Sequence, residues 1–173
     1  MRRTGLHLVL VSIASLLLGG ATSYAQPALP AALSSFANSA SGWTILCALL
    51  VVLAAPRVAV GAGMGAASFV CLVLGYTVAS HVRGFAYSPT SWLLVAVLAG
   101  PVVGAAAAAL RWPSRRLAVA GGLTLAVILV ADGVRGLVVL GASTSPVYWT
   151  LVIALGLALV ARVSVRQRSR RRR

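Results

Sequence analysis

The chain has 173 residues, of which 60% are hydrophobic and only 9% are charged, and its mean hydropathy is +0.99. A soluble domain carries roughly 25% charged residues, so this composition cannot supply a water-facing surface. The sequence contains fifteen arginines and a single acidic residue. The arginines lie at the ends of apolar runs and in one terminal segment rather than on one face, so we reject nucleic-acid binding as the main interpretation of the positive charge. We therefore expect a membrane protein whose main partner is the lipid bilayer.

Apolar runs separated by short polar or arginine-bearing links predict about six transmembrane helices. A span needs roughly 20 residues, and the second and sixth runs are shorter, so we expect each to gain residues from its outer flank. The fold class is an all-α integral membrane bundle with one transmembrane domain over 1–162 and a basic cytoplasmic tail over 163–173. The predicted spans are 5–24, 41–55, 58–80, 91–110, 117–140 and 146–160.

The first run also fits a second interpretation, a secretory signal peptide. Arg2 and Arg3 precede an apolar run that ends in a small-x-small pattern at residues 23–25, which is typical of a cleavage site. The uncharged run is long for a signal peptide, and Gly19 and Ser23 suit helix packing, so retention as a span is favoured. Cleavage would leave five spans, with the topology of the remainder unchanged.

Arginine placement predicts the orientation of the bundle. Cytoplasmic links carry the excess of arginine, and an N-terminus inside the cell places thirteen of the fifteen arginines there. The exceptions are Arg83, in an outer link, and Arg135, within the fifth span. We therefore expect a multi-pass protein of the bacterial cytoplasmic (inner) membrane, with both termini in the cytoplasm.

The first outer link, over 26–42, carries no charge. Pro30 can begin a short helix, which lies in the interface or dips into the bundle. Ser39 or Ser41 can cap the second span, because a side-chain oxygen at this position accepts a hydrogen bond from the first turn. The apolar residues of this short helix recur at i, i+4 and i+7: Leu29, Leu33 and Phe36.

Two Gly-xxx-Gly patterns, Gly61 with Gly65 and Gly100 with Gly104, predict seams where helices approach closely. The seams can form within one chain or between protomers. Cys47 and Cys71 lie within apolar runs at a spacing that matches no metal or redox motif, so we expect both to be small packing residues.

Asp132, the only acid, lies in the fifth span about 22 Å from its inner end, within a hydrocarbon core roughly 30 Å thick. Ionisable residues within a membrane are costly and often functional. Arg135 follows at i+3 on the same helix face, so the two can neutralise each other while Arg135 extends outward. The pair is either a structural ion pair or the centre of a polar pocket that opens to the outside.

Further polar residues gather at the level of Asp132, whereas the opposite level carries mainly arginine. This asymmetry points to an outward-facing site. The candidate ligand-binding residues are Asp132, Arg135, Arg83, Tyr24, Gln26, Asn38 and Tyr76. With one acid and two distant histidines, we expect no catalytic residue, no metal and no cofactor, and hence no enzyme.

The last twelve residues carry seven arginines, each of which could gain about 1 kcal/mol from anionic lipids on the cytoplasmic side. We expect this tail to bind anionic lipid head groups rather than RNA or a docking partner. The residues assigned to this lipid-binding role are Arg166, Arg168, Arg170, Arg171, Arg172 and Arg173.

The segments 19–26, Leu29-Pro30 and 37–43 (GGATSYAQ, LP and ANSASGW) resemble an uncharacterised family of small multi-spanning membrane proteins from high-GC Gram-positive bacteria. That family has no established activity, so the resemblance implies no site residues. In architecture alone, six spans with both ends inside are similar to the substrate-binding subunits of energy-coupling-factor vitamin transporters.

Two functions remain open from the sequence. The favoured one is a small-solute binding or transport component with an outward-facing polar pocket. The alternative is a structural or partner-binding subunit without a ligand, associated with another membrane protein or with copies of itself. An intramembrane enzyme is the least favoured.

Overall fold

The computed structural model describes the backbone of residues 2–55 and 57–169, and side chains over 3–55 and 57–163. Within these ranges the chain is helical and contains no strand. The elements are α1 (Arg2–Ala28), the 3₁₀ helix η1 (Ser34–Asn38), α2 (Ala40–Ala54), α3 (Val58–Val82), α4 (Thr90–Ala109), α5 (Arg115–Val139) and α6 (Pro146–Ser169).

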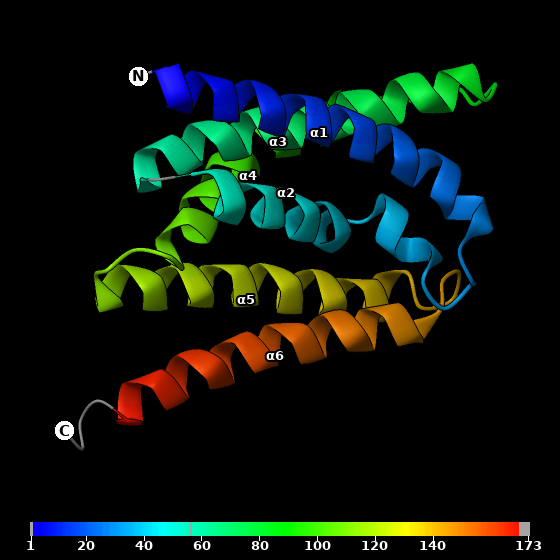
Figure 1. Cartoon of the computed structure of the whole chain (residues 1–173). Helices are drawn as coiled ribbons and strands as arrows, with labels where there is room; N and C mark the ends of the chain where they lie inside the picture. Colours follow the sequence, from blue (N-terminus) through cyan, green and yellow to red (C-terminus); the bar gives the residue numbers. More distant parts are fainter. Residues whose placement is uncertain (1, 56, 170–173) are drawn as a thin grey trace.

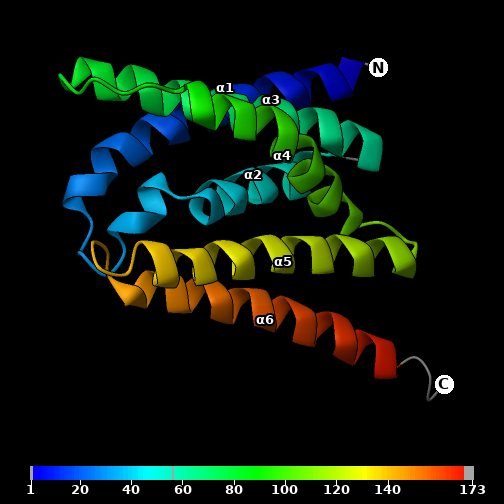
Figure 2. The same cartoon turned by 180° about the vertical axis from the view of Figure 1, so that it is seen from behind.

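The α-helices alternate in direction, which gives the bundle two ends (Figure 1). We call one the Asp132 end; it contains the links 29–39, 83–89 and 140–145. The other, the arginine end, contains the start of α1, Arg57, the link 110–114 and the end of α6. Figure 2 shows α2 between the group formed by α1, α3 and α4 and the pair formed by α5 and α6. The chain therefore buries α2 on several sides.

Five helices are long and apolar enough to cross a membrane within the described residues: α1, α3, α4, α5 and α6. The predicted helices are thus present, but the second one is short. α2 has 15 residues and spans about 22 Å, which is less than a hydrocarbon core of roughly 30 Å.

The second and sixth helices were expected to be longer at their outer flanks, and neither is longer there by a full turn. The outer flank of α2 forms a separate element, η1, because Ser39 adopts an extended backbone (φ −137°, ψ 157°) that ends the helix. α6 begins at Pro146, as predicted, because proline suits the first helical position and cannot extend a helix backward. α6 gains its length at the arginine end instead and continues through Ser169, into the segment expected as a tail.

The two glycine patterns pack against each other within one chain, where α3 crosses α4. A Cβ atom added to Gly61 would lie 2.7 Å from the carbonyl oxygen of Gly104, and one added to Gly65 would lie 2.6 Å from the Cα atom of Gly104. Real Cβ atoms do not approach backbone this closely. The seam is therefore internal, and it requires residues without side chains.

Serine pairs join α1 to α3. The hydroxyl groups of Ser15 and Ser68 are 2.7 Å apart, and those of Ser23 and Ser80 are 3.0 Å apart. All four side chains are buried, so each pair satisfies hydroxyl groups that would otherwise lie unbonded in an apolar interior.

Candidate functional site: the break in the second span

Ser39 separates η1 from α2 just before the predicted second span, and we call this separation the break. Ser39 is the N-cap of α2, and its side-chain oxygen accepts a hydrogen bond of 3.0 Å from the backbone N–H of Gly42. Serine favours this position because its hydroxyl satisfies one of the amide groups that have no partner within the helix. The break thus places the N-terminus of α2 inside the bundle, facing α5 and α6.

Asp132 of α5 lies directly at this helix N-terminus. Its Oδ2 atom accepts a hydrogen bond of 2.8 Å from the backbone N–H of Ser41, and its side chain is only 7% exposed. A helix N-terminus carries a partial positive charge, so it favours a carboxylate at this position. The only acid of the chain is therefore held by the backbone of a different span.

Tyr148 of α6 completes a cluster of hydroxyl groups at the break. Its phenolic oxygen lies 2.8 Å from the hydroxyl of Ser39 and 2.8 Å from that of Ser41, and the two serine hydroxyls are 3.3 Å apart. All three side chains are buried. The break, with Asp132 and these hydroxyls, joins α2, α5 and α6 in one polar cluster, which we call the break cluster (Ser39, Ser41, Asp132 and Tyr148).

Arg135 contacts the break cluster only loosely. One guanidinium nitrogen lies 3.9 Å from Oδ1 of Asp132, and the Arg135 side chain is 59% exposed. An exposed pair at this distance contributes little to stability. The main partner of the Asp132 carboxylate is thus the Ser41 amide, which lies far away in the sequence, and not the arginine one helical turn away.

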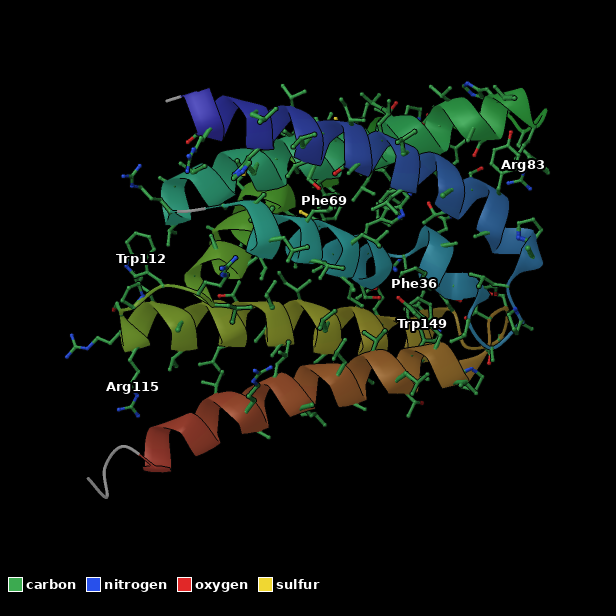
Figure 3. All side chains as sticks on the ribbon, viewed as in Figure 1. Phe36, Phe69, Arg83, Trp112, Arg115 and Trp149 are labelled. Atoms are coloured by element: carbon green, nitrogen blue, oxygen red, sulfur yellow. The ribbon has the colours of Figure 1, made fainter. Side chains whose placement is uncertain are left out.

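A second polar cluster surrounds Arg83, where α3 ends beside α1 (Figure 3). The Arg83 guanidinium donates to the carbonyl oxygen of Ser23 and, at 3.1 Å, to its hydroxyl. It also lies over the rings of Tyr24 and Phe85, 5.3 and 5.0 Å from their centroids. Hydrogen bonds and cation–π contacts therefore hold this charge at the end of α1.

Tyr76 connects the Arg83 cluster to a group of buried aromatic rings. Its hydroxyl donates to Oε1 of Gln26 at 2.6 Å, and its ring centroid lies 5.7 Å from that of Trp43 and 4.9 Å from that of Tyr87. The Tyr87 hydroxyl is buried and has no hydrogen-bond partner among the described residues. Burial, reinforced by the neighbouring Tyr76, raises the pKa of Tyr87 to about 12.

The seven candidate residues therefore fall into separate places rather than around one pocket. Asp132 and Arg135 belong to the break, whereas the Arg83 group holds Tyr24, Gln26 and Tyr76. The fully buried ring of Trp43 contacts Tyr76 at the margin of that group, and its indole N–H donates to the carbonyl of Ala37. Asn38 lies on η1, and its Oδ1 atom is buried without a partner among the described residues.

An apolar cavity borders the break cluster at Tyr148. It measures about 250 Å³ and lies between η1, α2 and α6. Tyr148 forms part of its wall, beside the residues that the sequence had grouped on one face of the first link. Its lining includes Leu29, Leu33, Phe36, Ile45, Tyr148 and Leu155.

Sequence reasoning missed Ser41 and Tyr148 as direct neighbours of Asp132. Ser39 and Ser41 were expected only as alternative caps of the second span, and Ser39 fills that role. The sequence pattern gave Tyr148 no role of its own. A signal was present in the Ser-x-Ser pattern before an apolar run, but nothing local indicates that a residue 91 positions later contacts it.

Both histidines contact backbone carbonyl groups. His7 bonds to the carbonyl oxygen of Ala54, and His81 bonds to that of Tyr87. No group of three or more His, Cys, Asp or Glu side chains lies together in the described part of the chain. Of the tail arginines, Arg166 and Arg168 have no described side chain, and Arg170 to Arg173 lie outside the described residues.

One protein family matches the chain over residues 1–173, the family of unknown function DUF6518. The chain belongs to this family. The match covers the whole chain, including the break cluster and the arginine end. No curated protein and no solved structure gave a match. DUF6518 membership assigns no activity, so a functional proposal rests on the geometry described above.

Proposed function

We propose that this DUF6518 protein is a multi-pass protein of the bacterial cytoplasmic membrane with both termini in the cytoplasm. Five long apolar helices support the membrane setting. The positive-inside rule supports the orientation, because the arginines collect at the end of the bundle that holds Arg57 and the link 110–114.

Reporter fusions test this orientation. Fusions after Arg116 and at the C-terminus should read cytoplasmic, and a fusion in the exposed link at Ser143 should read external. An external signal from the C-terminal fusion would overturn the orientation, and it would do so whether or not the first span is removed as a signal peptide.

Within that setting, the chain acts as a binding or transport component for a small polar solute, with its site at the break cluster. The observation that carries this proposal is the Asp132 carboxylate at the buried N-terminus of α2, next to the break that separates α2 from η1. Interrupted helices that bring a helix terminus and a charged group together inside the membrane are typical of transporter binding sites. A carboxylate beside three hydroxyls offers acceptors to a solute with hydrogen-bond donors, such as a protonated amine.

The energetics of Asp132 favour a functional role over a purely structural one. A carboxylate inside the membrane costs about 2.5–3.5 kcal/mol on insertion scales. A hydrogen bond to a charged group returns about 1.5–3 kcal/mol, so the two terms nearly cancel. An asparagine could accept the same bond from Ser41 without the charge. Stability alone therefore gives no reason for an acid at this position.

Accessibility to a cationic reagent tests the proposal. Ser39 and Ser41 are buried in this structure, so a binding site requires a second state in which the break opens outward. The test variant carries Ser41→Cys in a background of Cys47→Ala and Cys71→Ala. Intact cells that express it would be treated with the membrane-impermeant reagent trimethylammonium-ethyl methanethiosulfonate. Ser41→Cys should be modified clearly faster than Val51→Cys.

Val51→Cys is a matched control because Val51 is also fully buried on α2. Ser143→Cys, in an exposed link, gives the upper limit of the labelling rate. Equal labelling of Ser41→Cys and Val51→Cys would show that the break stays closed. That result would overturn the solute site.

A structural or partner-binding subunit is the second candidate, and one observation favours it. The polar groups of the break already bond to one another: Asp132 to the Ser41 amide, and Tyr148 to both serine hydroxyls. A closed cluster of this kind can join three helices without any ligand. We further propose that the chain is not an enzyme. Among the described residues, both histidines bond to backbone carbonyls, and no second carboxylate side chain lies beside Asp132.

A further inference from the structure

A large hollow lies at the arginine end, away from the break cluster. It measures about 730 Å³ and lies between the last turn of α2, the link 110–114, the first turns of α5 and the last described side chains of α6. Figure 3 labels Trp112 and Arg115, both of which line it, at this end of the bundle. We call it the arginine cleft. Its size is in the range of small-molecule binding sites.

Three arginines line the arginine cleft: Arg111, Arg115 and Arg162. The single acid of the chain, Asp132, is 17 residues from Arg115 along α5, which corresponds to about 25 Å. Within the described part of the chain, no side-chain carboxylate therefore lies near enough to balance these cations. Arg111 donates a hydrogen bond of 2.7 Å to the carbonyl of Val52, which also lines the cleft.

The N-terminus of α5 adds positive potential to the same place. Its first turn begins with Arg115 and Arg116 and contains no acid, and the side chain of its N-cap, Ser114, makes no capping hydrogen bond. Cations at a helix N-terminus are unfavourable, because the unpaired amide groups already carry partial positive charge. A bound anion would pair with both the amide groups and the arginines.

The remaining walls of the cleft are apolar. They therefore favour an anion that carries an apolar chain over a small hydrated anion. Leu159 and Val163 of α6 face the cleft together with Ala118 and the half-buried Trp112. Walls of this kind suit an acyl chain better than a hydrated free phosphate, and tryptophan favours the level of lipid head groups.

We propose that the arginine cleft binds one anionic phospholipid. Its phosphate lies among Arg111, Arg115 and Arg162, and its acyl chains lie against Leu159 and Val163. Arginine suits this role because its guanidinium binds phosphate oxygens through two parallel hydrogen bonds. Basic pockets between membrane helices on the cytoplasmic side are known to hold acidic lipid head groups. The site differs from diffuse attraction by the terminal arginines, because a cleft of fixed volume saturates at one lipid.

Lipid binding to the full chain in detergent micelles tests the proposal. The probes are dihexanoyl phosphatidylglycerol, dihexanoyl phosphatidylcholine and inorganic phosphate, and native mass spectrometry counts the bound molecules. The wild type should retain one phosphatidylglycerol in a saturable manner. Arg115→Gln with Arg162→Gln should raise the dissociation constant at least about tenfold, on the scale of one lost charge-assisted hydrogen bond.

The matched control is Arg3→Gln with Arg57→Gln, which removes the same charge from exposed arginines that are neither in the first turn of α5 nor among the residues lining the cleft. This control should change the dissociation constant less than about twofold, as expected for screened surface charges. A second variant, Ala118→Trp, fills the cleft without changing any charge. It should also lose the lipid, and it keeps the test decisive if the arginine double variant does not fold.

Three results would each overturn the proposal. Equal retention of phosphatidylcholine would mean that the charge is not recognised. Displacement of the lipid by inorganic phosphate at equal concentration would identify a site for a free phosphorylated solute. An equal loss in the cleft variant and the Arg3/Arg57 control would mean that only the overall charge attracts the lipid.

Discussion

The two ends of this bundle differ in how their charged side chains are paired. At the Asp132 end, the carboxylate is 7% exposed and bonds to a backbone amide, and Arg83 is held by Ser23 and two aromatic rings. At the arginine end, Arg115 and Arg162 line an open cleft with no acid nearby. Polar groups at the first end bond mainly to one another, whereas Arg115 and Arg162 at the second end line the cleft that we propose to bind a lipid.

The glycine seam between α3 and α4 should show the largest effect, because it supports the bundle between both ends. Gly65→Ala would place a Cβ atom 2.6 Å from the Cα atom of Gly104, and backbone cannot move aside as a flexible side chain can. We expect a loss of about 3 kcal/mol or more in unfolding free energy, at the upper range for overpacking. Thermal unfolding in detergent measures it.

Gly63→Ala is the matched control, two residues away on the same helix. Nothing lies within 4 Å of a Cβ atom at Gly63, so this change should be neutral or stabilise by up to about 1 kcal/mol through helix propensity. Equal losses from both substitutions would show that α3 and α4 do not meet at Gly65.

Asp132 and Arg115 test the difference between the ends directly. Asp132→Ala leaves the Ser41 amide buried without its partner and should lower stability by about 1–3 kcal/mol. Arg115→Gln should leave stability unchanged or raise it by about 0.3–1 kcal/mol, because it removes a cation from a helix N-terminus. Both are measured by thermal unfolding in detergent without anionic lipid.

Arg135→Gln distinguishes the contribution of the Arg135 ion pair from that of the Ser41 amide. Because Arg135 is mainly exposed, this change should lower stability by less than about 1 kcal/mol. A loss as large as that of Asp132→Ala would instead show that the ion pair, rather than the Ser41 amide, holds the carboxylate.

The cap at the break should contribute a smaller amount. Ser39→Ala removes the bond to the Gly42 amide and should lower the unfolding free energy by about 1 kcal/mol. Ser39→Asn should recover most of this loss, because asparagine also caps helices well. If Asn and Ala behave alike in chemical denaturation, the hydroxyl contact with Tyr148 rather than the cap is what matters at this position.

Tyr87 should show the smallest effect at neutral pH. Its buried hydroxyl has no partner among the described residues, so Tyr87→Phe should change stability by less than about 0.5 kcal/mol. The variant keeps the backbone carbonyl that bonds to His81.

Alkaline pH separates the Tyr87 variant from the wild type. Burial raises the pKa of Tyr87 to about 12, whereas an unfolded tyrosine ionises near 10. The contribution of the neutral hydroxyl is therefore fully present below pH 10 and is lost as the pH rises from 10 through 12. Between pH 10 and 12, the unfolding free energy should therefore fall less steeply with pH for Tyr87→Phe than for the wild type. Chemical unfolding curves at several pH values measure this slope. An identical pH dependence in both proteins would contradict the assignment.

Much of the fold follows from one-dimensional properties of the sequence. The length of an apolar run decides whether a helix can cross a bilayer, and five of the six predicted helices have that length in the structure. The Ser39 cap was also predictable, because an N-cap depends on a side chain and an amide group only three residues apart. The glycine patterns indicated close helix contacts for the same local reason, since a four-residue spacing places both glycines on one helix face.

Only the tertiary structure decided which partners these local features meet. The glycine pattern of α3 could have paired with another protomer, and the packing of α3 on α4 assigned it to Gly100 and Gly104 of the same chain. Asp132 was expected to rely on Arg135, its nearest opposite charge in sequence, but the break in the second span offers it the Ser41 amide, 91 residues away. Helix periodicity fixes which residues share a face of one helix, whereas contacts between helices depend on crossings that no local pattern encodes. The arginine cleft arises in the same way, because Arg111, Arg115 and Arg162 share a cavity only where the ends of α2, α5 and α6 meet.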